Sequence, residues 1–398
     1  MSETRDDNGR YGAATVALFT AMFAAQAALI ALSPVLAQAA GDLHVSTAAA
    51  GQLRTIAGLA AGVTALGLGA LGARLGLGRQ LLIASALLAI GSLASAAAPS
   101  FALLAVAQLP IGVAVAVLTT AATLAAAEWV SPERRTRALS WALVGQPTAW
   151  IVGMPLIGLV GGHSWRYGLV LPLAAAVVAA FLVASRSGQP PVQSRRASSR
   201  TALADRAVAR WVVSELFANA AWAGTLVFSG ALFAESYATS PRMTGLLLAV
   251  SAAVYVAGNL AGRRLVRLEP RRVLFQLAVL LAVADALFGI VRPGVLVSSA
   301  LFSVMAFAAG SRTLVASSFA LAAPPEVRPA VTSLRAATMQ FGYFVGSIAA
   351  GTALAVGGYG ALGAAMGLLF AGAAASLVGR PRLAPVRRPL PAVYRAQG

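Results

Sequence analysis

Three charged side chains, Glu215, Asp285 and Arg312, interrupt long apolar runs of the sequence. If those runs cross a bilayer, each charge at a helix centre costs at least about 2.5–3.5 kcal/mol, so such a charge usually has a partner or a function. Glu215 shares one helical face with residues at later positions in the same run, namely Asn219, Trp222 and Ser229. These side chains are the candidates for binding or proton-transfer chemistry.

Glu215 and Arg312 are expected to be partners because they lie at a similar shallow depth from the same membrane surface. A structural ion pair and a titrating transport switch are equally open explanations. For Asp285, a neutral or hydrogen-bonded acid packed between helices is favoured over a coupling role. Arg54 lies near the opposite surface, where it either extends to the headgroups or pairs with Asp42.

The elements that position these residues must be membrane-spanning helices. Of the 398 residues, 59% are hydrophobic and 11% are charged, and the mean hydropathy is +0.80. Soluble domains carry about 25% charged residues. Runs of roughly 18 residues or more can cross the hydrocarbon core as helices, which satisfy their own backbone hydrogen bonds. The sequence therefore predicts an all-α integral membrane protein.

Missing residue types exclude several kinds of chemistry. The chain has no cysteine and no lysine, which removes thiolate metal sites, disulfides, Schiff bases and the P-loop lysine. His44 and His163 are predicted in loops without paired-ligand spacing. We therefore expect no enzyme activity, no cofactor and no metal site. The net charge of +18 is explained by arginines on alternate loops that face anionic phospholipids, rather than by nucleic-acid binding.

Two short patterns occur twice. Gly69-x-Leu71-x-x-Arg74 returns as Gly258-x-Leu260-x-x-Arg263, and Pro132-Glu133-x-Arg135 returns as Pro325-Glu326-x-Arg328. The offset is about half the chain in both cases, which indicates a tandem duplication. Parallel repeats of membrane helices are a common plan of secondary transporters.

Twelve spans are predicted, six in each half. They cover residues 11–38, 47–70, 80–98, 101–127, 138–161, 167–185, 210–234, 241–262, 273–291, 294–320, 330–355 and 359–378. The domain plan is a cytoplasmic N-terminus (1–10), an N-terminal six-helix bundle (11–185), a flexible cytoplasmic linker (186–209), a C-terminal six-helix bundle (210–379) and a basic cytoplasmic tail (380–398). Arginine counting places both termini in the cytoplasm, in a cell membrane.

The repeated loops resemble signatures of the major facilitator superfamily. Gly69-Ala-Leu71-Gly-Ala73-Arg74-Leu-Gly76 is similar to its loop between spans two and three, and the segment from Glu128 to Ala138 is similar to its loop between spans four and five. Gly153-Met154-Pro155, Gly158 and Trp165-Arg166 resemble the drug:proton antiporter and small-molecule efflux branch. The resemblance implies two pseudo-symmetric six-helix bundles around a central cavity.

Two departures from the family pattern concern coupling and gating. Ala73 and Gly262 stand where the signatures usually carry an acid, and the fourth span, around Gln108, lacks the arginine that such antiporters commonly use. Whether transport is coupled to protons is therefore left undecided by the sequence. The gate residues implied by the family are Gly69, Arg74, Glu128, Arg135, Arg263 and Arg335. Arg74 and Glu128 either latch the inner gate or form a solvated ion pair.

Family geometry also implies which side chains line the cavity. They are Gln26, Gln108, Thr119, Thr123, Gln146 and Trp150 in the first half, and Asn219, Trp222, Tyr255, Met305, Gln340 and Tyr343 in the second. This apolar and aromatic lining with scattered amides and hydroxyls suits an amphiphilic small molecule. Arginine at the midplane, as an anion site would need, is not evident from the sequence.

The leading hypothesis is a monomeric secondary active exporter of small amphiphilic or apolar molecules, with Glu215 as the first and Asp285 as the second candidate for a titrating group. An uptake symporter or uniporter for a metabolite is the alternative within transport. A non-transporting membrane receptor or scaffold is the alternative from another class.

Overall fold

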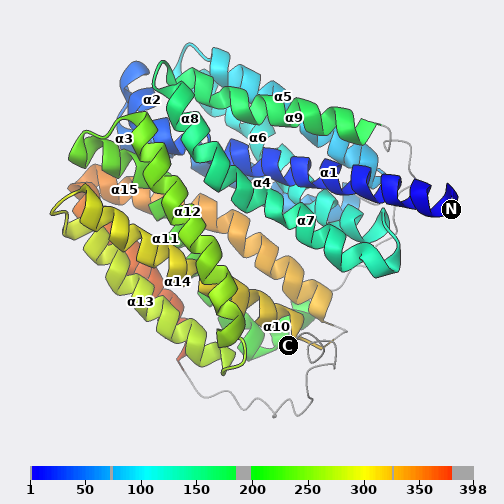
Figure 1. Ribbon diagram of the computed structural model, residues 1–398. Coiled ribbons are helices and arrows are strands. Elements are labelled where there is room, and N and C mark those ends of the chain that lie inside the picture. The colour runs from blue at the N-terminus through cyan, green and yellow to red at the C-terminus, as the bar shows by residue number, and fades with distance from the viewer. Residues whose placement is uncertain (1, 72–74, 185–198, 325–326, 379–398) are drawn as a thin grey trace.

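The computed structural model describes residues 2–71, 75–184, 199–324 and 327–378, and these are almost entirely helical (Figure 1). The first half consists of α1 (Ser2–Ile30), η1 (Ser33–Val35), α2 (Leu36–Asp42), α3 (Thr47–Gly51), α4 (Leu53–Leu71), α5 (Leu77–Ala97), α6 (Phe101–Glu128), η2 (Pro132–Arg134), α7 (Arg135–Thr148), η3 (Ala149–Gly153), α8 (Met154–Gly161), η4 (Trp165–Leu169) and α9 (Val170–Ala184). The second half consists of α10 (Ser199–Ala204), α11 (Arg206–Tyr237), α12 (Pro241–Leu265), α13 (Pro270–Ile290), α14 (Val295–Leu321) and α15 (Arg328–Leu377).

Within the described ranges, ten segments are long and apolar enough to cross a membrane. One of them, Ala330–Leu377, is about twice the usual length. It contains a break, because Gly357 and Gly358 have non-helical backbone angles and Gly358 has a φ of +64°, a value that favours glycine. Dividing this segment at the break, and adding α3 with α4, fits the predicted twelve spans.

Prolines explain why two predicted spans are not single regular helices. The first is interrupted at Ser33–Val35, where Pro34 starts a short 3-10 turn. The fifth continues from α7 through a π-helical turn, Ala149–Gly153, into α8. Pro155 lacks a backbone N–H, so the helix hydrogen-bond ladder cannot run through this region without adjustment. Turns of this π type are frequent at functional sites.

Two boundaries differ from the predictions. α1 begins at Ser2, so the helix extends through most of the predicted N-terminal tail. The predicted flexible linker at 186–209 contains the short helix α10, whose Ala202 is buried. Both segments are helical outside the predicted spans because many polar residues also have a high helix propensity.

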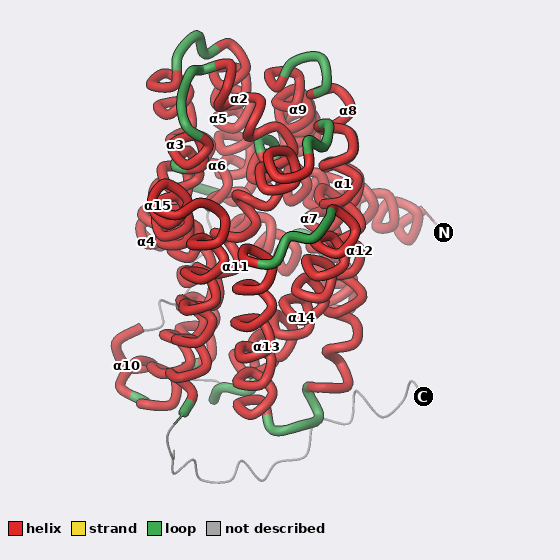
Figure 2. The backbone as a smooth tube through the Cα atoms, turned by 90° about the vertical axis from the view of Figure 1, so that its left-hand side faces the viewer, coloured by secondary structure: helices red, strands yellow, loops and turns green. Residues whose placement is uncertain are grey.

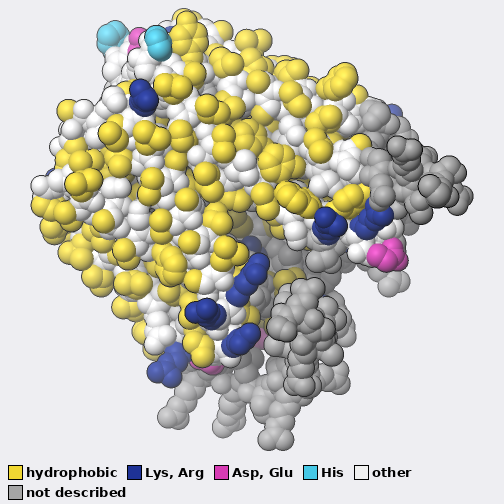
Figure 3. Space-filling model, viewed as in Figure 1, with side chains coloured by type: hydrophobic (Ala, Val, Ile, Leu, Met, Phe, Trp, Pro, Cys, Tyr) yellow, Lys and Arg dark blue, Asp and Glu magenta, His cyan; other side chains and the backbone are white. Residues whose placement is uncertain are grey.

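The helices form two bundles, each packed mainly on itself. α1 and α4–α9 make the first bundle and α11–α15 make the second. Figure 2 shows the helices running along a common direction, with many of the loops gathered toward the two ends. Hydrophobic side chains cover most of the face drawn in Figure 3, as expected for a surface in contact with lipid.

The bundles contact each other near one end, here called the contact end, which carries α2, α3, the end of α11 and the start of α12. There α4 packs on α15 and α8 packs on α12. Glycines permit this approach: a Cβ on Gly245 would lie 2.5 Å from the Met154 carbonyl oxygen and 3.3 Å from Gly158 Cα.

The opposite end, here called the arginine-rich end, carries the exposed side chains of Arg135, Arg263 and Arg264. Most arginine side chains visible in Figure 3 lie in the lower part of the picture, toward this end. The main packing partners of α6 lie within the first bundle, and those of α14 lie within the second. The two bundles are therefore held together at the contact end.

Candidate functional site

The predicted pair between Glu215 and Arg312 is present. An Arg312 guanidinium nitrogen lies 2.8 Å from Glu215 Oε1, and the two side chains are 6% and 2% exposed. Arg312 also donates to the carbonyl and hydroxyl oxygens of Ser214, both at 3.4 Å. α11 and α14 thus hold opposite charges together in the protein interior, where an unpaired charge would be costly.

Arg335 on α15 adds a second cation to this pair. Its Nε lies 3.9 Å from Glu215 Oε2, and its side chain is 18% exposed. Another of its guanidinium nitrogens donates to the Thr313 carbonyl oxygen at 3.2 Å. Arg335 was expected at a gate, but its guanidinium joins the central charges instead. Two arginines face one carboxylate, so this group is net positive.

An aromatic wall lies beside these charges. Trp222 stacks on Tyr255 and on Phe302, with ring centroids 6.2 Å and 6.0 Å apart. The Tyr255 hydroxyl donates to Thr313 Oγ1 at 2.8 Å. Trp222 and Tyr255 are half-buried, whereas the neighbouring Met305 is fully buried in the core. The wall combines apolar area with a fixed polar edge.

Asn219 and Tyr343 extend the same surface along α11 and α15. Asn219 Nδ2 donates to Thr338 Oγ1 at 3.3 Å. Tyr255 is close enough to Tyr343, Arg335 and Glu215 to interact electrostatically with all three. Gln340 on α15 is half-buried. We call this set the central cluster; its members are Glu215, Asn219, Trp222, Tyr255, Arg312, Thr313, Arg335, Thr338 and Tyr343.

The first bundle contacts this cluster through Arg54. The Arg54 guanidinium carbon lies 4.7 Å from the centroid of the Tyr343 ring, a cation–π contact between the two bundles. Neither alternative predicted for Arg54 is found, because the side chain is buried rather than extended to the surface and does not pair with Asp42. Asp42 instead accepts from Trp165 Nε1 at 2.8 Å and pairs with Arg166 at 3.2 Å. Arg54 is drawn inward because the close packing of α4 on α15 offers it an aromatic face.

Asp285 is separate from the central cluster. It is fully buried between α11 and α13, where Thr225 Oγ1 lies 2.8 Å and 3.0 Å from its two carboxyl oxygens. No cation pairs with it among the residues that the structure describes. A neutral acid could donate to Thr225, whose own proton would then reach the Ala221 carbonyl oxygen at 3.1 Å. This geometry agrees with the predicted hydrogen-bonded acid packed between helices.

Comparison with known proteins decides the family. A family model described as Major Facilitator Superfamily matches residues 17–234, which is more than half of the chain. The chain belongs to the Major Facilitator Superfamily. No curated protein matches the sequence.

Solved structures share the fold of this superfamily member at low identity. One is a bacterial homolog of the human lysosomal transporter Spinster, in an inward-facing and occupied conformation. It has 14% identity and a TM-score of 0.70, covering 91% of this chain and 93% of that chain. Another is the nucleoside transporter NupG in its D323A mutant form, with 16% identity and a TM-score of 0.72, covering 92% and 98%. These likenesses establish the fold.

In this superfamily member, the cavity candidates of the first bundle make mostly local bonds. Gln108 Nε2 donates to Ser95 Oγ on the neighbouring α5 at 3.2 Å. The hydroxyls of Thr119 and Thr123 each donate to the carbonyl four residues earlier, at 2.8 Å. The remaining three candidates lie on α1, on α7 and in the π turn: Gln26 is buried, and Gln146 and Trp150 are half-buried.

The expected gate residues are distributed around the arginine-rich end. Gly69 lies in α4, while Arg74 falls outside the described residues. Glu128 is exposed at the end of α6, Arg135 is exposed at the start of α7, and Arg263 is exposed in the last turn of α12. The Arg74–Glu128 latch therefore stays a prediction.

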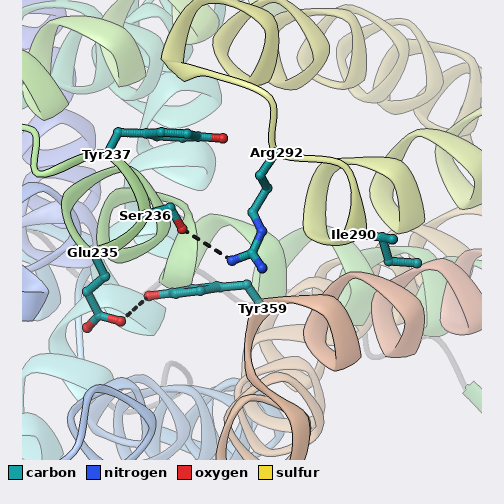
Figure 4. A pocket seen from close by; sticks show the side chains of 6 residues that line it. All are labelled: Glu235, Ser236, Tyr237, Ile290, Arg292 and Tyr359. Atoms are coloured by element: carbon teal, nitrogen blue, oxygen red, sulfur yellow. Dashed lines mark hydrogen bonds between the residues drawn. The ribbon is translucent and has the colours of Figure 1, made fainter.

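A polar pocket of about 580 Å³ lies at the contact end of the second bundle, away from the central cluster (Figure 4). Its lining residues are Glu235, Ser236, Tyr237, Ile290, Arg292 and Tyr359. The Tyr359 hydroxyl donates to Glu235 at 2.9 Å, and Thr47 of the first bundle donates to the other Glu235 oxygen. Glu235 thus links the two bundles.

Sequence reasoning missed three contributors to the cluster. Thr313 and Thr338 accept the bonds of Tyr255 and Asn219, and Arg54 reaches Tyr343. Threonines in apolar helices usually bond to their own backbone and give no signal of a tertiary role. The signal for Arg54 was present, since it is a charge inside an apolar run.

Proposed function

We propose that this protein is a secondary active transporter that exports small amphiphilic molecules by alternating access. The observation that supports this most is the position of the central cluster. It combines charges, hydroxyls and an aromatic wall where two bundles face each other, and those bundles contact each other near one end. A ligand held there would have polar partners at one side and apolar area at the other.

In this proposal, the arginine-rich end faces the cytoplasm, both termini are cytoplasmic, and the protein lies in the cell membrane. Positive residues are retained on the cytoplasmic side, where they also meet anionic phospholipids. The conformation would then be closed toward the outside and accessible from inside. A rocking motion that breaks the contact end and closes the arginine-rich end would carry the ligand outward.

Glu215 is the proposed coupling residue. A proton on its carboxyl group would remove the charge that holds Arg312 and Arg335. The arginines would then be released toward the ligand or toward a new partner, so protonation and ligand binding would compete. Asp285 has no such cationic partners in the described part of the chain and is the second choice.

The test uses the purified full-length chain in proteoliposomes with an imposed pH gradient and a panel of fluorescent amphiphiles. We expect gradient-dependent movement by the wild type and loss of gradient dependence in Glu215→Gln. Asp285→Asn is the matched acid-to-amide control and should keep the dependence. Transport that ignores the gradient in the wild type would exclude proton coupling.

Direction is tested in the same vesicles by counterflow of labelled metabolites, nucleosides among them. Export is supported if amphiphiles inhibit the counterflow of the labelled compounds. It is also supported if vesicles in which the protein is inserted inside out accumulate the amphiphiles. Accumulation of a polar metabolite driven in the uptake direction would favour the symporter alternative. If no compound moves, the non-transporting receptor or scaffold is favoured.

A further inference from the structure

The central cluster carries an excess of positive charge. Arg312 and Arg335 face the Glu215 carboxylate, and Arg54 contacts Tyr343 of the same cluster. Asp285 does not compensate, because it is buried elsewhere against Thr225. Among the described residues, the cluster together with Arg54 therefore carries three cations and one anion. The excess is costly in a protein interior unless something else supplies negative charge.

Arg54 is the strongest sign of a missing partner. The residue is 7% exposed, and no carboxylate lies within ion-pair distance of it in the described ranges. Its neighbour is the face of the Tyr343 ring. A cation–π contact contributes about 0.5–2 kcal/mol, which is less than the several kcal/mol needed to desolvate an ion.

Arg54 lies at the start of α4, and its guanidinium reaches Tyr343 of α15. Tyr343 lies near the middle of the helical segment from Arg328 to Gly357, roughly 20 Å from either end at about 1.5 Å of rise per residue. Gly58 fixes the packing there, since a Cβ on it would lie 2.8 Å from the Phe344 nitrogen. The guanidinium is thereby held between the bundles, against the middle of this helical segment.

An apolar body has a place next to this charge. Arg335 and Tyr255 both donate hydrogen bonds to Thr313, and Tyr255 stacks on Trp222. Arg335 is the more exposed arginine of the Glu215 group, and its Nε makes no hydrogen bond. The charged groups and the aromatic wall are therefore adjacent parts of one surface.

We propose that the transported molecule is an organic anion with an aromatic or apolar body, whose anionic group is held by Arg54. Its body packs on Trp222 and Tyr255. This inference rests on the proposed transport function and names its substrate class. A planar guanidinium suits carboxylates and phosphates because it donates two parallel hydrogen bonds.

The test compares naphthalene carboxylate with its neutral carboxamide, two probes of the same body and size. Binding to the purified full-length protein is measured by calorimetry and by tryptophan fluorescence. The wild type should bind the carboxylate at least about tenfold more tightly than the amide. Arg54→Gln should remove this preference, and Arg54→Lys should keep part of it. Arg242→Gln removes an exposed arginine at the contact end and should leave the preference unchanged.

Stability separates a ligand-binding Arg54 from a structural one. If Arg54 serves to bind an external anion, Arg54→Met should leave the melting temperature unchanged or raise it. The substitution removes a buried charge that has no partner in the described part of the protein. A large fall in melting temperature for Arg54→Met overturns the proposal. So does equal or tighter binding of the amide or of naphthylmethylammonium, failure of the carboxylate to bind, or a preference that survives Arg54→Gln.

Proteoliposome flux distinguishes this proposal from the proposed function. If cationic or neutral amphiphiles move and anions do not, transport stands and the anion assignment fails. If the carboxylate binds through Arg54 but nothing crosses the membrane, the anion site stands and transport fails.

Discussion

The two bundles use their polar residues differently. In the second bundle, side chains pair across helices: Glu215 with Arg312, and Asn219 with Thr338. In the first bundle, the Thr119 hydroxyl bonds to its own helix and Gln108 bonds to the adjacent helix. A duplicated architecture therefore does not imply duplicated chemistry. The second bundle carries the buried charge network, and the first contributes a packing surface, the buried Arg54 and the more exposed Asp42–Arg166 pair.

The interface between the bundles also has two characters. At the contact end, glycines bring backbones together, as at Gly245 and Gly158. Toward the centre, Arg54 meets Tyr343 through a charged side chain. Small residues give rigid, close packing, while a cation–π contact can be exchanged for a ligand. The following predictions test this contrast, beginning with the largest expected effect.

Removing the central acid should have the largest effect on stability. Glu215→Leu leaves Arg312 buried without its carboxylate partner, and we expect a loss of about 3–5 kcal/mol. The measurement is reversible unfolding of the purified protein in mixed micelles. The double variant Glu215→Leu with Arg312→Met should recover much of this loss, because the pair is then replaced by apolar groups. Additive losses in the double variant would show that the two residues are not coupled.

Widening the contact end should shift the conformational equilibrium. Gly245→Val places a side chain against the Met154 carbonyl, and overpacking of this kind costs about 1–3 kcal/mol. We expect the population with separated contact ends to rise by about tenfold. Cysteines introduced at the exposed positions 163 and 242 would carry spin labels, and the chain has no native cysteine to interfere.

Gly360→Val is the matched control, because an added Cβ there meets nothing within 4 Å. It should leave the distance distribution unchanged. An unchanged distribution in Gly245→Val would contradict the view that glycine packing holds the contact end closed.

Removing the hydroxyl that links the bundles should have a smaller effect in the same direction. Thr47→Val deletes the donor to Glu235, at a site that is partly exposed to solvent, so we expect about 0.5–1 kcal/mol and a shift of a few-fold. The same spin-label distance reports it. Tyr359→Phe removes the other donor to Glu235 within one bundle and should shift the distance less. Equal shifts would mean that the link between bundles has no special role.

The smallest effect is expected in the first bundle. Thr123→Val removes a hydroxyl that bonds to the Thr119 carbonyl of its own helix at an exposed position, so stability should change by less than about 0.5 kcal/mol. Unfolding in mixed micelles measures this beside Glu215→Leu. A loss above about 1 kcal/mol would show a tertiary role for this hydroxyl and weaken the contrast between the bundles.

Much of the fold could be predicted from the sequence because membrane helices are coded locally. Apolar runs, turn residues and the repeats gave the spans and the two halves, and the depth argument correctly paired Glu215 with Arg312. The departures were at Pro34 and Pro155, where proline disturbs a helix without ending the span. The break at Gly357–Gly358 lies where the last two predicted spans are separated.

The sequence by itself determined that this chain is an all-helical membrane protein with a few charges that need partners, because the bilayer imposes those requirements on every segment. The tertiary structure decided which partners meet. Asp42 pairs with Arg166, Asp285 is hydrogen-bonded to Thr225, and Arg54 contacts the ring of Tyr343. The contact of Arg54 with Tyr343 depends on how closely α4 approaches α15, and these two helices are far apart in the chain.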